Sequence, residues 1–170
     1  MLIPEVAPSR AAIVALARAW LGTPYHHQAS ERGAGVDCIG LVRGIYRALY
    51  GCEPAPLPGY SRDWSEVSGD EALLHAASSH LVGIDPPRAR PGDVLVFRYR
   101  ARHVAKHAGI LASATDGESL LRRSAGRHDP AAAAPTFIHA AEGAPVAEVP
   151  LSPWWQRRIA GAFSFPGVID

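Results

Sequence analysis

A cysteine at the start of a predicted helix is the residue best placed to do chemistry in this chain. Asp37 and Cys38 lead into apolar residues at helical spacing, and Gly51 is suited to end the helix. Asp37 is a good N-cap because its carboxylate accepts a hydrogen bond from a first-turn N–H. Unpaired N–H groups and the helix dipole stabilise a thiolate there, so Cys38 is predicted to be a nucleophile at neutral pH. The alternative is a small, buried packing residue.

A cysteine nucleophile needs a base that takes its proton, and histidine suits this role at neutral pH. The chain has eight histidines. His107 opens one predicted strand and His139 lies in another, so adjacent antiparallel strands can bring the two rings together. A third polar group usually orients such a base. His75, His80 and His128 are interpreted as surface or packing residues.

A metal site is the competing use of the histidines. His103 and His107 are four residues apart, and His26 and His27 are adjacent. The acidic residue of a zinc-protease helix and a Cys-x-x-Cys pair are both missing. Residues 103–107 are also predicted as strand or loop, where a spacing of four does not converge. The sequence therefore predicts neither a metal nor a cofactor.

The order of predicted elements favours an α+β domain. Helices are expected over residues 10–21, from Cys38 to just before Gly51, and over 69–82, with a further helical turn at 119–123. Strands are expected over residues 93–98, 107–111, 135–140, 145–151 and 159–165. Helices first and strands afterwards predict N-terminal helices packed on a mainly antiparallel sheet. The 170 residues fit a single domain, 1–170.

Charge and cysteine content exclude several classes of protein. The net charge of +1 gives no overall reason to expect nucleic acid as a partner. Two cysteines are too few for a disulfide framework, and Cys52 is interpreted as a small packing residue. A stripe of basic residues is interpreted as a solvated strand face, with contact to an anionic polymer as the alternative. The stripe consists of Arg98, Arg100, Arg102, His103 and Lys106.

Five short motifs follow one another in an order that resembles a known family. They are Leu21-Gly22-Thr23-Pro24-Tyr25, Asp37-Cys38-x-Gly40-Leu41-Val42, Pro91-Gly92-Asp93-Val94-Leu95-Val96-Phe97, His107-Ala108-Gly109-Ile110 and Phe137-Ile138-His139-Ala140. Together they resemble the NlpC/P60 family of cell-wall cysteine peptidases, over about residues 10–165. The resemblance implies a papain-like fold. Each motif alone is modest, but the five in this order are specific.

The resemblance also assigns roles by position. Cys38 matches the nucleophile, His107 the general base and His139 the residue that orients the base. Tyr25 matches a tyrosine near the oxyanion site, and Asp37 an acidic residue that contacts the amino end of the substrate. The Cys38 N–H is expected to help hold the oxyanion. By resemblance, the bond cut is an amide in the stem peptide of peptidoglycan, often one joining D-glutamate to a diamino acid, without a metal or cofactor.

Two features depart from the family pattern. Ile39 stands where the family often has serine, which removes a polar substrate contact and bears on recognition of a free peptide amine. The segment 113–135 is longer than in compact members. Two other functions remain open: an acyltransferase or amidase that uses the same cysteine, and a structural tail component with a vestigial site.

The place of action follows from a second resemblance. Residues 25–30, Tyr-His-His-Gln-Ala-Ser, resemble the version carried by tailed phages and gene transfer agents. The chain shows no secretory signal and no apolar run long enough to span a membrane, so we expect synthesis in the cytoplasm and transport by a carrier. We therefore expect a virion component at a phage-like tail tip, bound to tail-tip proteins, that opens the wall of the recipient cell.

The segment 154–158, Trp-Trp-Gln-Arg-Arg, is the candidate for attachment to the tail. Aromatic residues and arginine are enriched at protein interfaces. The alternative is a turn before the last strand with its tryptophans packed on the sheet.

Overall fold

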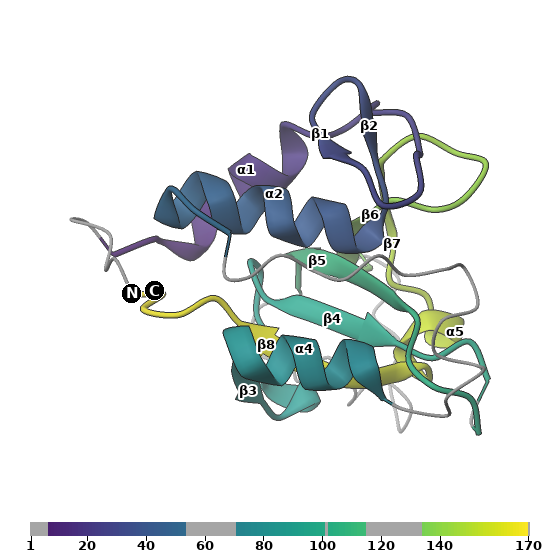
Figure 1. The fold of residues 1–170 in the computed structure, drawn as a ribbon. Coiled ribbons are helices and arrows are strands. Elements are labelled where there is room, and N and C mark those ends of the chain that lie inside the picture. The colour runs from purple at the N-terminus through teal and green to yellow at the C-terminus, as the bar shows by residue number, and fades with distance from the viewer. Residues whose placement is uncertain (1–6, 54–70, 101, 115–133, 170) are drawn as a thin grey trace.

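In the part of the chain that the structure describes, helices pack against a six-stranded antiparallel sheet, which confirms the expected fold class. The computed structural model describes residues 7–53, 71–100, 102–114 and 134–169. The helices of nine or more residues are α1 (Arg10–Arg18), α2 (Cys38–Tyr50) and α4 (Ala72–His80) (Figure 1), and a 3-10 turn, η1, spans Pro86–Arg88. The sheet has the order β3-β8-β4-β5-β6-β7, and every neighbouring pair is antiparallel. Its strands are β3 (Val82–Ile84), β4 (Val94–Phe97), β5 (His107–Ser113), β6 (Thr136–His139), β7 (Ala147–Pro150) and β8 (Ile159–Ser164).

Alternating side chains give the sheet two apolar faces. Val94 and Val96 of β4 pack in the larger core cluster, which includes the buried side of α1 and α2. Leu95 and Phe97, which alternate with them in the sequence, pack in a second cluster on the opposite face. Phe97 lies directly across from His107 in the pairing of β4 with β5. Residues opposite each other in an antiparallel pair share a face, so the His107 side chain is on the Phe97 face.

Helix α2 has the ends that the sequence predicts. The Asp37 side chain accepts a hydrogen bond from Gly40 N–H, and Gly51 ends the helix with a φ of 73°. Leu41 and Ile45 are fully buried in the larger core cluster, and α2 lies against β5 (Figure 1). Gly44 is in the closest contact, because a Cβ there would lie 2.1 Å from Trp20 Cζ2. A bare glycine surface therefore lets α2 and the turn after α1 approach each other.

Several elements differ from the sequence prediction. Helix α1 ends at Arg18 rather than residue 21, and single turns carry the chain onward. The hairpin of β1 (Ser30–Glu31) and β2 (Gly35–Val36), the strand β3 and the helix α5 (Pro153–Gln156) were not expected. These elements have two to four residues, too few to show a periodicity. The helical turn expected at 119–123 and the first residues of the helix expected over 69–82 lie outside the described residues.

Two expectations about the surface are wrong. Cys52 is exposed just after the end of α2, so it is not a packing residue. The basic stripe is not a strand face, because β4 ends at Phe97 and residues 98–106 connect it to β5. Arg98 is paired with Glu71 at 2.8 Å, while Arg100, Arg102 and His103 are exposed. Within the described part of the chain, no helix is long and apolar enough to cross a membrane.

Replacing Gly44 with alanine is expected to destabilise the domain. The added Cβ meets the Trp20 ring at 2.1 Å, and overpacking of a core typically costs about 1–3 kcal/mol of unfolding free energy. Denaturant unfolding of Gly44→Ala against the parent chain measures this loss. Gly83→Ala is the matched control, because a Cβ at Gly83 meets nothing within 4 Å. Equal losses in the two variants would contradict the close approach of α2.

Candidate active site

The start of α2 places Cys38 over the first residues of β5. Asp37 caps the helix, and Cys38 is its first residue. The Cys38 sulfur lies 3.9 Å from the Lys106 carbonyl oxygen, in hydrogen-bonding contact. The backbone N–H of Ala108 also interacts with the sulfur and favours the thiolate. Lys106 and Ala108 flank His107, so the thiol lies beside the backbone of the predicted base.

The two predicted partners of the thiol lie together. His107 Nε2 is 2.8 Å from His139 Nδ1, and the two rings meet edge to face. His107 is the first residue of β5 and His139 the last of β6, which pair as neighbours. The two side chains are only 3% and 9% exposed. The prediction that adjacent antiparallel strands bring these histidines together is confirmed, and their catalytic roles remain predictions.

The histidine pair leaves one nitrogen of His107 for the thiol. Because Nε2 is bonded to His139, the Nδ1 atom is the one that can accept a proton from Cys38. For that tautomer Nε2 carries the hydrogen and donates it to His139 Nδ1. In the described state the thiol bonds to the Lys106 carbonyl instead. Such contacts often tighten only when substrate binds.

The surroundings of Cys38 and His107 oppose the charged form of each group. Burial, and secondly the negative charge of Asp37, raise the pKa of the Cys38 thiol to about 12. Burial, and secondly the nearby His139, lower the pKa of His107 to about 3. Burial also lowers the pKa of His139. The expected thiolate at neutral pH is therefore wrong for this state, because burial outweighs the helix-start N–H groups. A neutral thiol beside an unprotonated base suits general-base catalysis instead.

Asp37 is occupied by the protein itself. One carboxylate oxygen accepts the N–H of Gly40 at 2.7 Å, and the other accepts the N–H of Gln28 at 2.7 Å. The His27 ring lies 3.7 Å from the second oxygen. Asp37 is 2% exposed. It thus joins α2 to the loop before it, where Gln28 has a φ of 64°, and contact with a substrate amine remains a prediction.

Tyr25 lies in the same loop, half-buried and packed partly against the larger core cluster. It forms an isolated parallel bridge to Val36, one residue before Asp37. The loop therefore carries Tyr25 to the Cys38 end of α2, and its oxyanion role stays a prediction. Ile39 is also half-buried against this cluster, so its side chain serves packing where a serine would offer a hydroxyl.

Sequence reasoning did not place aromatic side chains beside the histidine pair: it named Trp155 only within segment 154–158 and did not name Tyr99. The Trp155 ring stacks on His107 with centroids 5.4 Å apart, and Tyr99 lies 5.8 Å from His107. Burial, and secondly the charges of Cys38 and Tyr25, raise the pKa of Tyr99 to about 12. Tyr99 is thus electrostatically coupled to the thiol and to Tyr25. The one available signal was an aromatic residue within the basic stripe.

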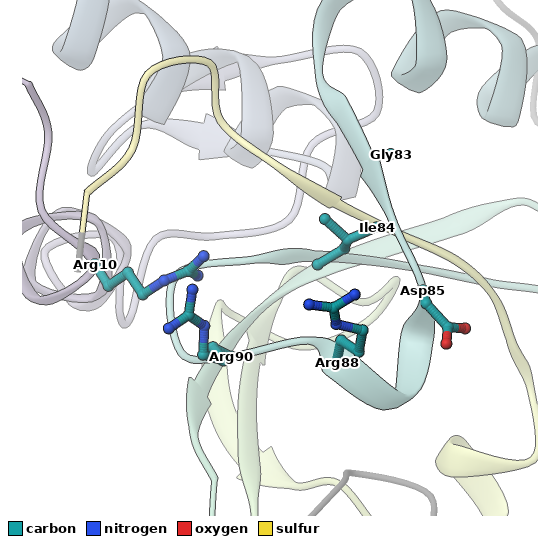
Figure 2. Close-up of a pocket in the computed structure, with 6 residues that line it drawn as sticks. All are labelled: Arg10, Gly83, Ile84, Asp85, Arg88 and Arg90. Atoms are coloured by element: carbon teal, nitrogen blue, oxygen red, sulfur yellow. The ribbon is translucent and has the colours of Figure 1, made fainter.

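A pocket of about 670 Å³ lies at the other end of β4 and is not the candidate active site (Figure 2). It is lined by Arg10, Gly83, Ile84, Asp85, Arg88 and Arg90. Arg10 pairs with Asp93, just before the first residue of β4, whereas His107 lies across from the last. The pocket lining contains neither a cysteine nor a histidine. Among the residues that the structure describes, no group of three or more metal-binding side chains could hold a metal ion.

The comparison with known families agrees with this geometry. The model of the NlpC/P60 family matches residues 22–163, which include every predicted site residue. The chain belongs to the NlpC/P60 family. Members of this family are cysteine peptidases that act on peptidoglycan. No curated protein matches the chain in sequence.

Solved NlpC/P60 structures confirm the papain-like fold. The NlpC/p60 domain of the peptidoglycan hydrolase SagA is 22% identical, with a TM-score of 0.57 over 92% of this chain and 99% of that one. A family protein from Bacillus cereus is 20% identical, with a TM-score of 0.60 over 94% of this chain and 41% of that one. NlpC2 from Trichomonas vaginalis is 18% identical, with a TM-score of 0.57 over 95% and 48%. The chain thus spans less than half of the last two proteins.

The raised thiol pKa predicts how this NlpC/P60 chain responds to alkylation. In a Cys52→Ser background, Cys38 should react with iodoacetamide with a midpoint above the ordinary thiol pKa of about 8.5, because its own pKa is about 12. Asp37→Asn removes the negative charge and should move the midpoint to lower pH. Burial, the larger cause, still holds the midpoint above the ordinary value.

Two measurements control this experiment. Circular dichroism tests whether the Asp37→Asn chain keeps its fold, since an asparagine oxygen can still accept from Gly40. Glu31→Gln removes an exposed acidic side chain of the hairpin and should leave the profile unchanged. A folded Asp37→Asn chain with an unchanged or higher midpoint would show that the carboxylate does not act on the thiol.

Proposed function

We propose that this chain is a cysteine endopeptidase that hydrolyses amide bonds in the stem peptides of peptidoglycan. The observation that carries the proposal is the 2.8 Å contact between His107 and His139 beside the helix-start thiol of Cys38. The family assignment supports the substrate class. An acyltransferase or amidase would use the same three residues, so only the products distinguish either of them from a stem-peptide endopeptidase.

The geometry supports a two-step hydrolysis. His107 Nδ1 takes the Cys38 proton as the sulfur attacks the peptide carbonyl carbon. His139, kept neutral by its burial, accepts the hydrogen bond from Nε2 and fixes the tautomer. The imidazolium then gives its proton to the leaving amine, and the C–N bond breaks to leave a thioester. Water, deprotonated by His107, releases the acid and restores the thiol.

The N–H groups at the start of α2 favour negative charge at this position. The N–H groups of Cys38 and Ile39 both favour the thiolate. The Cys38 N–H is the proposed backbone donor for the oxyanion, which carries a negative charge like a thiolate and lies two bonds beyond the sulfur. Tyr25 is the proposed side-chain donor. Preorganised donors of this kind act without further reorganisation at the moment of reaction.

We also propose that the protein works at the tip of a phage-like tail. The support is the resemblance of residues 25–30 to the versions of the family carried by tailed phages and gene transfer agents. These residues include Tyr25, and the loop is held against α2 by Asp37. A peptidase at this position would open the wall of the recipient cell only where the tail touches it. The alternative is a structural tail protein whose active site is vestigial.

Three substitutions are expected to remove activity in a graded order. Cys38→Ala removes the nucleophile and should abolish release of muropeptides from purified peptidoglycan, measured by mass spectrometry. His107→Ala removes the base and should lower kcat by about 10²- to 10⁴-fold. His139→Ala should cost less, because it orients the base and moves no proton.

The exposed residues Cys52 and His75 supply the matched controls, since alanine at either should leave activity unchanged. Circular dichroism establishes that each variant is folded. Release of muropeptides by folded Cys38→Ala protein would contradict the peptidase. A larger loss for His139→Ala than for His107→Ala would mean that the two roles are exchanged. Products that carry a new acyl acceptor in place of water would identify a transferase.

Purified particles test the tail assignment. If the protein is a tail-tip component, proteomics should find it in intact particles after density-gradient separation, and labelled antibodies should mark one end of the tail. A cytoplasmic protein of the producing cell, followed through the same gradient, controls for contamination. Recovery of the chain only from cell lysates would refute the tail-tip role and leave an enzyme of lysis.

A further inference from the structure

Two large aromatic side chains are exposed next to the histidine pair. Tyr99 is 43% exposed and Trp154 is 41% exposed. Their rings lie 6.4 Å apart although 55 positions separate them in the sequence (99 to 154). Tyr99 comes two residues after β4, and Trp154 is in α5. Figure 1 shows α5 at the same end of the sheet as the start of α2, where Cys38 lies. We call Tyr99 and Trp154 the aromatic platform.

The aromatic platform is built on the candidate active site. The Tyr99 ring is 5.8 Å from the His107 ring, and it is 6.1 Å from Trp155. Trp155 in turn stacks on His107 and packs against Phe97 at 5.0 Å. At most one side chain would therefore separate a ligand on the aromatic platform from the ring of the predicted base, His107.

The aromatic platform is held in place by Arg158. Its guanidinium lies over the Trp154 ring, 3.7 Å from the centroid. Its Nε donates to the Tyr99 carbonyl and its Nη1 to the Trp154 carbonyl, both at 3.0 Å. One arginine thus ties together the two segments that supply the platform. Because the two aromatic rings are ordered before binding, less side-chain entropy is lost when a ligand binds.

We propose that the aromatic platform binds a sugar ring of the glycan strand that carries the stem peptide. This inference rests on the proposed function and adds a glycan subsite beside the thiol. A pyranose ring presents C–H groups on its faces, which match the flat, electron-rich surface of an aromatic ring. A polar stem peptide rich in carboxylates offers no surface of that kind. Its anionic groups match a free guanidinium, whereas the Arg158 guanidinium here already lies over the Trp154 ring and donates to the Tyr99 and Trp154 carbonyls.

The size of the aromatic platform favours a sugar over a tail protein. A stable protein interface buries about 800 Å² on each partner, far more than two side chains expose. A tail protein seated on Tyr99 and Trp154 would have to extend over the neighbouring surface. Because Tyr99 lies against His107, that surface includes the approach to the thiol. A permanent partner there would exclude the substrate, and attachment to a tail therefore belongs on another face.

A binding experiment with the inactive Cys38→Ala chain tests the proposal. Its ligands are peptide-free glycan chains prepared from peptidoglycan and, separately, free stem peptide, and calorimetry measures both affinities. Trp154→Ala is expected to weaken glycan binding up to about tenfold and to leave peptide binding unchanged, and Tyr99→Ala is expected to weaken glycan binding to a similar extent. Trp154→Phe should restore most of the glycan affinity. Val82→Ala is the control, because Val82 is 53% exposed on the edge strand β3.

Kinetics add a second measurement on the active chain. Trp154→Ala should raise KM for a disaccharide-linked stem peptide and leave kcat/KM for the free peptide unchanged. Equal losses on both substrates, or weaker binding of the free peptide, would overturn the glycan subsite. If the Trp154→Ala chain binds glycan normally but is lost from purified particles, the aromatic platform is a protein-docking surface instead. Glycan binding is measured without turnover, so it can succeed even if the peptidase activity fails.

Discussion

The buried carboxylate of Asp37 is the interaction on which the candidate site depends. It caps α2 through Gly40 and holds the preceding loop through Gln28. The contact at Gly40 leaves no room for a side chain, since a Cβ there would lie 1.9 Å from the Ala29 carbonyl oxygen. The loop and the helix start are thus fixed against each other by one acidic side chain and one glycine. Tyr25 and Cys38 take their relative positions from that arrangement.

This arrangement has an electrostatic cost. A negative charge one residue before the thiol opposes its ionisation, and burial opposes it more strongly. The N–H groups at the start of α2 lower the pKa of the thiol, but their effect is smaller than that of burial. In the proposed mechanism a neutral base therefore removes the proton during attack, and no stored thiolate is needed. That requirement explains the burial of His107 and His139, because burial lowers both pKa values and keeps the rings able to accept protons.

Local patterns were sufficient to predict the parts of the site that depend on neighbouring residues. Asp37 as the cap and Gly51 as the end of α2 follow from short segments, whereas the pairing of the His107 and His139 strands was expected from the order of the predicted strands. The ionisation state of Cys38 could not be predicted in this way. It depends on what buries the sulfur, and Lys106 and Ala108 reach it from another part of the chain. The argument from the helix dipole alone therefore predicted a lowered pKa for the Cys38 thiol, whereas burial raises it.

The aromatic residues show the same limit at the other side of the histidine pair. The Trp-Trp sequence of α5 was compatible with an exposed attachment surface or with packing on the sheet, and each tryptophan does one of these. Trp155 packs on His107 and Phe97, whereas Trp154 is exposed beside Tyr99. Their division follows from a four-residue helix that turns adjacent side chains in different directions. The half-buried Trp155 ring covers one side of His107, and the exposed Trp154 ring lies at the edge of the same site, where the proposed glycan subsite uses it.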